Sequence, residues 1–136
     1  MTAWWARFGV GLITVLLMPR TALACELPTG WTSMKFEADA SMRAALSQAE
    51  ASIQVGQPFA IDIAVCALGT VEAIKVDAMM PRHRHGMNYT PKITRVSSNR
   101  FRADPLLFHM PGLWRITMKA YRAGKPVHFS LDMSVK

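Results

Sequence analysis

The carboxyl-terminal stretch that decides the fold is W-R-I-T-M-K-A-Y-R-A-G-K-P-V-H-F-S-L-D-M-S-V, residues 114–135. Apolar residues occupy alternate positions on both sides of Ala123-Gly124-Lys125. Such alternation indicates strands with one buried and one solvated face, and a short glycine-containing break between two of them indicates a hairpin. The residues expected to face the core are Trp114, Ile116, Met118, Ala120, Val127, Phe129, Leu131, Met133 and Val135.

Upstream of this hairpin, shorter alternating runs recur between turn-forming residues. Residues 59–65 and 74–80 predict two core strands, and residues 89–96 and 100–108 predict two more. Pro91 cannot donate a ladder hydrogen bond, so the run 89–96 suits an edge strand. With a short first strand near Ile53 the total is about seven, as in immunoglobulin-like domains. The sequence therefore predicts an all-β, immunoglobulin-like antiparallel β-sandwich over residues 50–136.

Residues 25–49 form an N-terminal extension whose structure the sequence leaves open. Met42, Ala45, Leu46 and Ala49 fit helical spacing. The same stretch could equally run extended across a sheet.

Residues 1–24 predict a cleaved signal peptide. Arg7 precedes an apolar run over residues 8–18, and Ala22-Leu23-Ala24 is a small-x-small cleavage site. A membrane-spanning helix is the alternative, but it needs roughly 20 apolar residues. We expect an exported protein, periplasmic or otherwise secreted, that begins at Cys25. Lipid on Cys25 would tether it to the membrane, but Ala22 stands where a lipobox needs leucine, which disfavours that reading.

The charge pattern argues against a nucleic-acid partner. The chain carries a net charge of +7, and Arg7 and Arg20 leave with the signal peptide. The remaining arginines are scattered along the chain, unlike the concentrated basic surface of a nucleic-acid-binding protein. We interpret them as solubilising residues that also favour an anionic membrane surface.

Cys25 and Cys66 are the two cysteines of the chain. In an oxidising compartment a disulfide bond between them is the expected state. The alternatives are thiolate metal ligands or a redox pair, but no C-x-x-C motif supports either. Cys66 shares the outward parity of Asp62 and Ala64, so the disulfide is expected on the outer face of a sheet rather than between the sheets.

Histidine and methionine concentrate in two stretches, M-M-P-R-H-R-H-G-M at residues 79–87 and F-H-M-P-G at residues 108–112. If the strands alternate in direction, the loops containing these stretches emerge at the same pole of the sandwich. Imidazole is the commonest metal-binding side chain, and thioether sulfur selects Cu(I). The predicted metal ligands are His83, His85, Met87 and His109.

Several details qualify this predicted metal site. His83 and His85 would project to one side of an extended segment, and Gly86 would relax the backbone beside them. H-x-H is common by chance, and methionine usually fills gaps in a core. Met80 and Met110 are therefore read as packing residues, and His128 as a solvated residue on an outward face.

The runs M-P-x-H-x-H-G-M-x-x-x-P at residues 80–91 and L-L-F-H-M-P-G-x-W at residues 106–114 resemble the YtkA-like family. The resemblance covers roughly residues 50–135 and leaves Cys25 outside. It implies an exported or membrane-attached immunoglobulin-like domain, related in style to FixH and CopC-like proteins and associated with copper handling or oxidase assembly. Carried onto this chain, it implies the same pole residues, His83, His85, Met87 and His109.

The sequence favours binding over catalysis. It has no G-x-S-x-G motif and no paired carboxylates in a polar context, and its cysteines are expected to pair. We expect no enzyme. The leading hypothesis is a periplasmic copper-binding or copper-delivery module that passes Cu(I) to a protein partner. The alternative is a metal-free interaction or accessory domain, in an oxidase-assembly or membrane complex, whose Arg82 and Arg84 contact an acidic partner.

Overall fold

The computed structural model describes residues 25–36, 42–48 and 52–136, so the predicted signal peptide lies outside the described residues. The described residues form strands, turns and loops, and none of them belongs to a helix long and apolar enough to cross a membrane. The strands are β1 (Thr32–Ser33), β2 (Lys35–Phe36), β3 (Met42–Gln48), β4 (Pro58–Ala67), β5 (Ala73–Met80), β6 (His85–Gly86), β7 (Lys92–Ser97), β8 (Arg100–Leu107), β9 (Gly112–Arg122) and β10 (Lys125–Val135).

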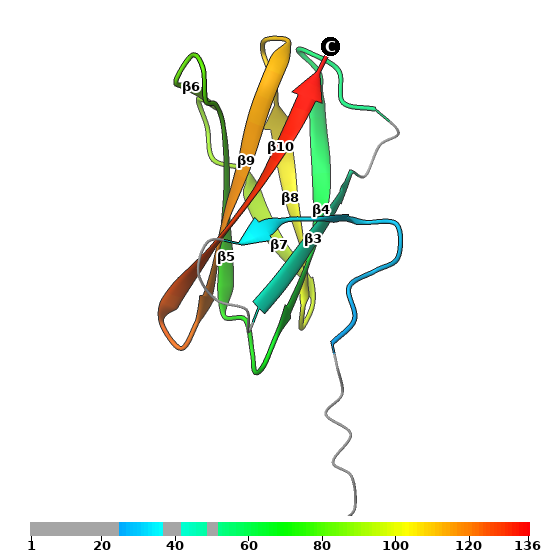
Figure 1. Cartoon of the computed structure of the whole chain (residues 1–136), viewed down its shortest axis with the longest axis vertical. Helices are drawn as coiled ribbons and strands as arrows, with labels where there is room; N and C mark the ends of the chain where they lie inside the picture. Colours follow the sequence, from blue (N-terminus) through cyan, green and yellow to red (C-terminus); the bar gives the residue numbers. More distant parts are fainter. Residues whose placement is uncertain (1–24, 37–41, 49–51) are drawn as a thin grey trace, which may run out of the picture.

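These strands pair into two antiparallel sheets, ordered β1-β3-β4-β8-β7 and β2-β10-β9-β5-β6. Setting aside the two-residue strands β1, β2 and β6, the orders become β3-β4-β8-β7 and β10-β9-β5. This is the A-B-E-D and G-F-C arrangement of a constant-type immunoglobulin domain. The two sheets pack face to face (Figure 1). The predicted immunoglobulin-like β-sandwich is confirmed, with seven longer strands among the described residues.

The alternation in the carboxyl-terminal hairpin places its apolar residues in the core, as predicted. Trp114 and Ile116 have no exposed surface, and Phe129 is 1% exposed. The register runs without interruption from Lys125↔Arg122 to Val135↔Gly112. Residues on the other face, such as Arg115 and Asp132, stay exposed and form an ion pair. One face of this hairpin therefore forms part of the hydrophobic core.

The predicted first strand near Ile53 is wrong, because residues 52–57 form a loop and turn. The first of the seven longer strands is β3, which pairs with β4 from Met42↔Ala67 to Gln48↔Ile61. Its side chains Met42, Ala44 and Leu46 are buried in the core. The extended alternative for this stretch is thus the correct one, and the sandwich begins well before the predicted boundary at residue 50. Pairing with β4 overrides the helical spacing, since spacing is only a weak local preference.

Cys25 and Cys66 form the predicted disulfide bond, with Cα atoms 5.4 Å apart. Cys66 is opposite the exposed Arg43 in the β3–β4 register, and it does not belong to the core cluster between the sheets. Arg43 Nη2 also donates a 2.7 Å hydrogen bond to the Cys25 carbonyl. Further along, the Arg100 guanidinium lies 5.1 Å from the Trp31 ring centre. The N-terminal segment is therefore fastened to the outer face of the β1-β3-β4-β8-β7 sheet, as expected.

Candidate metal centre

The first histidine-bearing loop is a tight turn at the end of β5. The Met80 carbonyl accepts hydrogen bonds from the backbone N–H groups of His83 (3.2 Å) and Arg84 (2.8 Å). Arg84 has a φ of 53°, in the left-handed region that non-glycine residues rarely adopt. The chain then reverses, and His85 in β6 pairs with Met80 of β5. A hydrogen-bonded turn therefore fixes the backbone of the segment that carries His83 and His85.

This geometry corrects the expected backbone at the H-x-H motif. Residues 81–84 form a turn and are not extended. The imidazole rings of His83 and His85 are neighbours nonetheless, with centres 6.2 Å apart. Gly86 has no positive φ, so the unusual backbone conformation falls on Arg84. Alternation predicted the right neighbours through the wrong local geometry, because a turn and an extended strand can both bring residues i and i+2 together.

The second histidine-bearing loop is anchored on the core by Trp114. The Trp114 indole Nε1 donates a 3.0 Å hydrogen bond to the Met110 carbonyl. Its ring stacks on Phe108 with ring centres 4.5 Å apart, and the His109 ring lies nearly perpendicular to it with ring centres 5.3 Å apart. The sequence predicted Trp114 only as a core residue. Its contact with His109 depends on the path of the loop, which alternation does not specify.

Gly112 lets the two loops approach each other closely. Its φ is +129°, and a Cβ at this position would lie 2.9 Å from the Met80 Cε atom. A side chain at Gly112 would therefore meet both an unfavourable backbone conformation and a clash with the end of β5. Met80 itself is 2% exposed, which confirms its predicted role in packing.

The two loops meet at one end of the sandwich, as the strand directions predicted (Figure 1). The ring centres of His85 and His109 are 6.4 Å apart, so His85 is a neighbour of both His83 and His109. A surface hollow of about 400 Å³ is lined by His85 and His109 together with Arg84, Gly86 and Asn88. We call this end, residues 81–87 and 108–112, the histidine pole.

Met87 is placed apart from the three histidines. Its side chain packs against the core and lines a groove beside β5, and it is absent from the hollow between His85 and His109. Met110 is also partly buried against the core, as predicted. His128 is exposed on β10 and pairs in register with Lys119, far from the end of the hairpin where Gly112 pairs with Val135. His83 lines a separate hollow of about 420 Å³, so the structure places His85 and His109 in one hollow and brings His83 near them through its 6.2 Å ring separation from His85.

The donor set fits a soft or borderline metal ion, but the rings stand slightly apart. Imidazoles that share one three- or four-coordinate ion, each with a metal–nitrogen bond of about 2.0 Å, have ring centres roughly 5 to 5.5 Å apart. The observed separations are 6.2 and 6.4 Å. Accordingly, no group of three His, Cys, Asp or Glu side chains in the described ranges stands ready to hold a metal ion. All three histidines are exposed, so small side-chain rotations can close the difference.

Comparison with known proteins supports the fold without assigning a function. No protein-family model matches the chain, and no curated protein matches it. A DUF4785 family protein from Legionella pneumophila has a similar solved structure, with a TM-score of 0.51 and 11% sequence identity. The similarity covers 71% of this chain and 28% of the Legionella chain, so this chain spans under a third of that protein's length. At this identity the likeness shows the β-sandwich fold alone.

Proposed function

We propose that the mature protein is an exported, periplasmic copper-binding module that holds Cu(I) at the histidine pole and delivers it to a protein partner. The observation that carries the proposal is that His85 has both His83 and His109 as ring neighbours, with ring centres 6.2 and 6.4 Å away. The three imidazoles come from two loops that the fold brings to one end of the sandwich.

The chemistry of these residues suits a delivery site. Imidazole binds copper, and the protein's part is to present its nitrogens in a fixed arrangement. Contact with Trp114 orients the His109 ring, while the turn closed by the Met80 carbonyl fixes the His83 backbone and leaves its exposed ring able to rotate. Because the histidines are exposed, a partner protein could reach an ion bound between them. Met87 is left outside the proposed ligand set, since its side chain packs against the core.

The disulfide bond supports the proposed location. A disulfide between Cys25 and Cys66 is typical of proteins that fold outside the cytoplasm. Lipidation would need the same Cys25 Sγ atom that the disulfide uses, so the two states exclude each other. We therefore propose a domain that diffuses freely after signal-peptide cleavage.

Anaerobic titration of residues 25–136 with Cu(I), in competition with a chromogenic chelator, tests the proposal. We expect about one Cu(I) per chain. His85→Ala should weaken binding by at least about tenfold, since the His85 ring is the one that neighbours both other rings. His83→Ala and His109→Ala should weaken it less. His128→Ala is the matched control and should leave affinity unchanged; unaltered binding in a His83→Ala/His85→Ala double variant would rule the site out.

A second candidate function is a metal-free interaction or accessory domain, such as part of an oxidase-assembly or membrane complex. It is favoured by the ring separations, which exceed those of a preformed site, and by exposed Arg82 and Arg84 on the turn. In this case the turn recognises an acidic protein surface. Capture of a periplasmic partner that a copper chelator leaves unchanged, and that Arg82→Glu/Arg84→Glu abolishes, would favour this function over copper delivery.

A further inference from the structure

The outer edge of β5, on the side away from β9, is closed at its two ends. Near the histidine pole, the Ala78 carbonyl accepts a hydrogen bond from Met87 N (3.1 Å). The Ala78 N–H is bonded to the carboxylate of its neighbour Asp77 (2.7 Å). At the other end, Arg95 Nη2 donates to the carbonyls of Val71 (2.9 Å) and Glu72 (2.6 Å), just before β5 begins.

Between these closures the backbone groups on this edge have no hydrogen-bond partner in the described residues, although Ile74 and Val76, which carry them, are only 4% and 3% exposed. Backbone groups alternate in direction along a strand, so Ile74 and Val76 turn their N–H and C=O groups to the same edge as Ala78. In the described part of the chain, no strand, loop or side chain hydrogen-bonds Ile74 or Val76 on that edge. Unpaired edge groups of this kind are a template for another strand.

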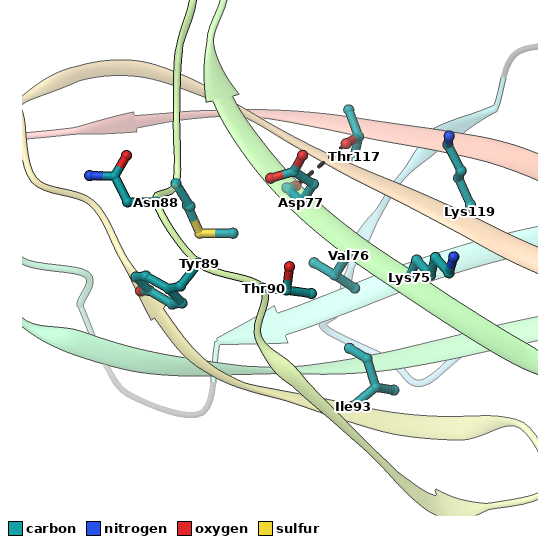
Figure 2. Close-up of a pocket in the computed structure, with 10 residues that line it drawn as sticks. Lys75, Val76, Asp77, Asn88, Tyr89, Thr90, Ile93, Thr117 and Lys119 are labelled. Carbon is teal, nitrogen blue, oxygen red and sulfur yellow. Dashed lines mark hydrogen bonds between the residues drawn. The ribbon is translucent and has the colours of Figure 1, made fainter.

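A surface groove of about 720 Å³ reaches this edge at Val76 (Figure 2), and Ile74 lies just beyond its lining. Val76 lines it on one side, Tyr89 and Thr90 of the connection to β7 on the other, and Ile93 of β7 at its base. Partial burial raises the pKa of Tyr89 above its usual value, although the residue is still 38% exposed. The groove therefore lies at the side of the sandwich, between β5 of one sheet and β7 of the other.

The charges beside the groove are unbalanced. Lys75 and Lys119 lie directly opposite each other on β5 and β9, and both line the groove. Like charges in this position destabilise a sheet. In the described ranges, neither lysine forms an ion pair, although the Lys75 Nζ lies 5.8 Å from the Tyr121 ring centre. Asp77 is the acidic residue of the groove lining, and its carboxylate is held by the Ala78 N–H.

We propose that this groove binds an extended acidic segment of another protein, which adds as a short strand to the open edge of β5. The segment exchanges backbone hydrogen bonds with Ile74 and Val76, and one of its carboxylates lies over Lys75 and Lys119. Backbone pairing supplies affinity and alternate side chains supply specificity, as in other cases of strand addition. The carboxylate also relieves the repulsion between the two lysines. The proposal is independent of copper binding at the histidine pole.

The test uses residues 25–136 and a six-residue peptide of alternating Glu and Thr, blocked at both ends. Calorimetry should detect binding of this peptide and none of its Lys–Thr counterpart. A version of the peptide that is N-methylated along one edge lacks the backbone N–H groups needed to pair with β5. It should bind at least about tenfold more weakly. Amide hydrogen exchange at Ile74 and Val76 should slow when the peptide is bound. The result should be the same with His85→Ala protein, which separates this site from the copper site.

Charge reversal provides the matched variants. Lys75→Glu/Lys119→Glu should lose the Glu–Thr peptide and gain the Lys–Thr peptide, while Lys35→Glu/Lys125→Glu, outside the groove, should behave as the unmodified protein. If the N-methylated peptide binds as tightly as the unmodified one, or if free glutamate competes fully, strand addition is wrong and the groove is a simple anion-binding site. No binding at millimolar peptide, together with self-association of Lys75→Val protein, would mean that Lys75 only guards the edge.

Discussion

The histidine pole and the disulfide-bonded face lie on the same sandwich but are built in opposite ways. At the pole, exposed imidazoles stand near one another without direct bonds between them. On the outer face of the β1-β3-β4-β8-β7 sheet, a covalent bond between Cys25 and Cys66 and a hydrogen bond from Arg43 fasten the N-terminal segment down. The first arrangement leaves donor atoms free for a ligand, and the second uses its groups to stabilise the fold. Substitutions in the two regions should therefore have separable effects on binding and on stability.

The largest effect is expected at Trp114, which belongs to the core and also supports the pole. It is completely buried, so Trp114→Ala should lower the free energy of unfolding by about 3–5 kcal/mol. It should also weaken Cu(I) binding, because the His109 ring and the Met110 carbonyl lose their partner. Urea denaturation and the copper titration measure the two effects.

Trp114→Phe covers the possibility that the alanine variant does not fold. Phenylalanine keeps an aromatic ring beside Phe108 but cannot donate to the Met110 carbonyl. We expect a folded protein with a smaller loss of stability and reduced copper affinity. Unchanged affinity in this variant would show that the pole does not depend on the core beneath it.

The next effect in size is expected at the disulfide bond. Cys25→Ser/Cys66→Ser opens a loop with a sequence separation of 41 residues and should lower the free energy of unfolding by about 2–4 kcal/mol. Both cysteines are replaced because a single free thiolate is itself a soft copper ligand. Copper stoichiometry and affinity should stay the same, as judged by the same titration. Loss of copper binding in the folded double variant would show that copper binding at the histidine pole depends on the disulfide-bonded face.

The smallest effect is expected at the exposed ion pair between Arg115 and Asp132 on β9 and β10. The hydrogen bond from Arg115 holds the pKa of Asp132 below its usual value. A folded pKa below the unfolded one means that the pair stabilises the protein above the unfolded pKa of about 3.9, and that this stability is lost as the pH falls through the folded value. Both side chains are more than a third exposed, so screening keeps the effect small.

Asp132→Asn should therefore lower the free energy of unfolding by about 0.5 kcal/mol at pH 7 and by much less at pH 2. Urea denaturation at the two pH values measures this difference. A loss at pH 7 as large as that of the disulfide variant would mean that exposed polar contacts, rather than the fastened face, set the stability of the domain.

Much of the fold follows from local patterns. The alternation of Trp114, Ile116 and Met118 correctly places them in the core, and strand direction correctly brings His109 to the H-x-H turn. The side-chain direction of Met87 and the turn at Arg84 were not predictable in the same way. They depend on β6 folding back onto β5, a pairing of two residues that leaves almost no mark in the sequence.

The sequence by itself determined the strand segments after residue 58, their core faces and the pairing of the two cysteines. These properties rest on short-range alternation and on the number of thiols, which need no knowledge of the partner strand. The tertiary structure decided that Met42–Gln48 is the first long strand, that the Met87 side chain packs against the core while the three imidazoles stay exposed, and that Ile74 and Val76 have no backbone partner on one edge of β5 in the described residues. The physical reason is that strand pairing, register and edge exposure arise from contacts between segments far apart in the chain, which a local pattern does not record.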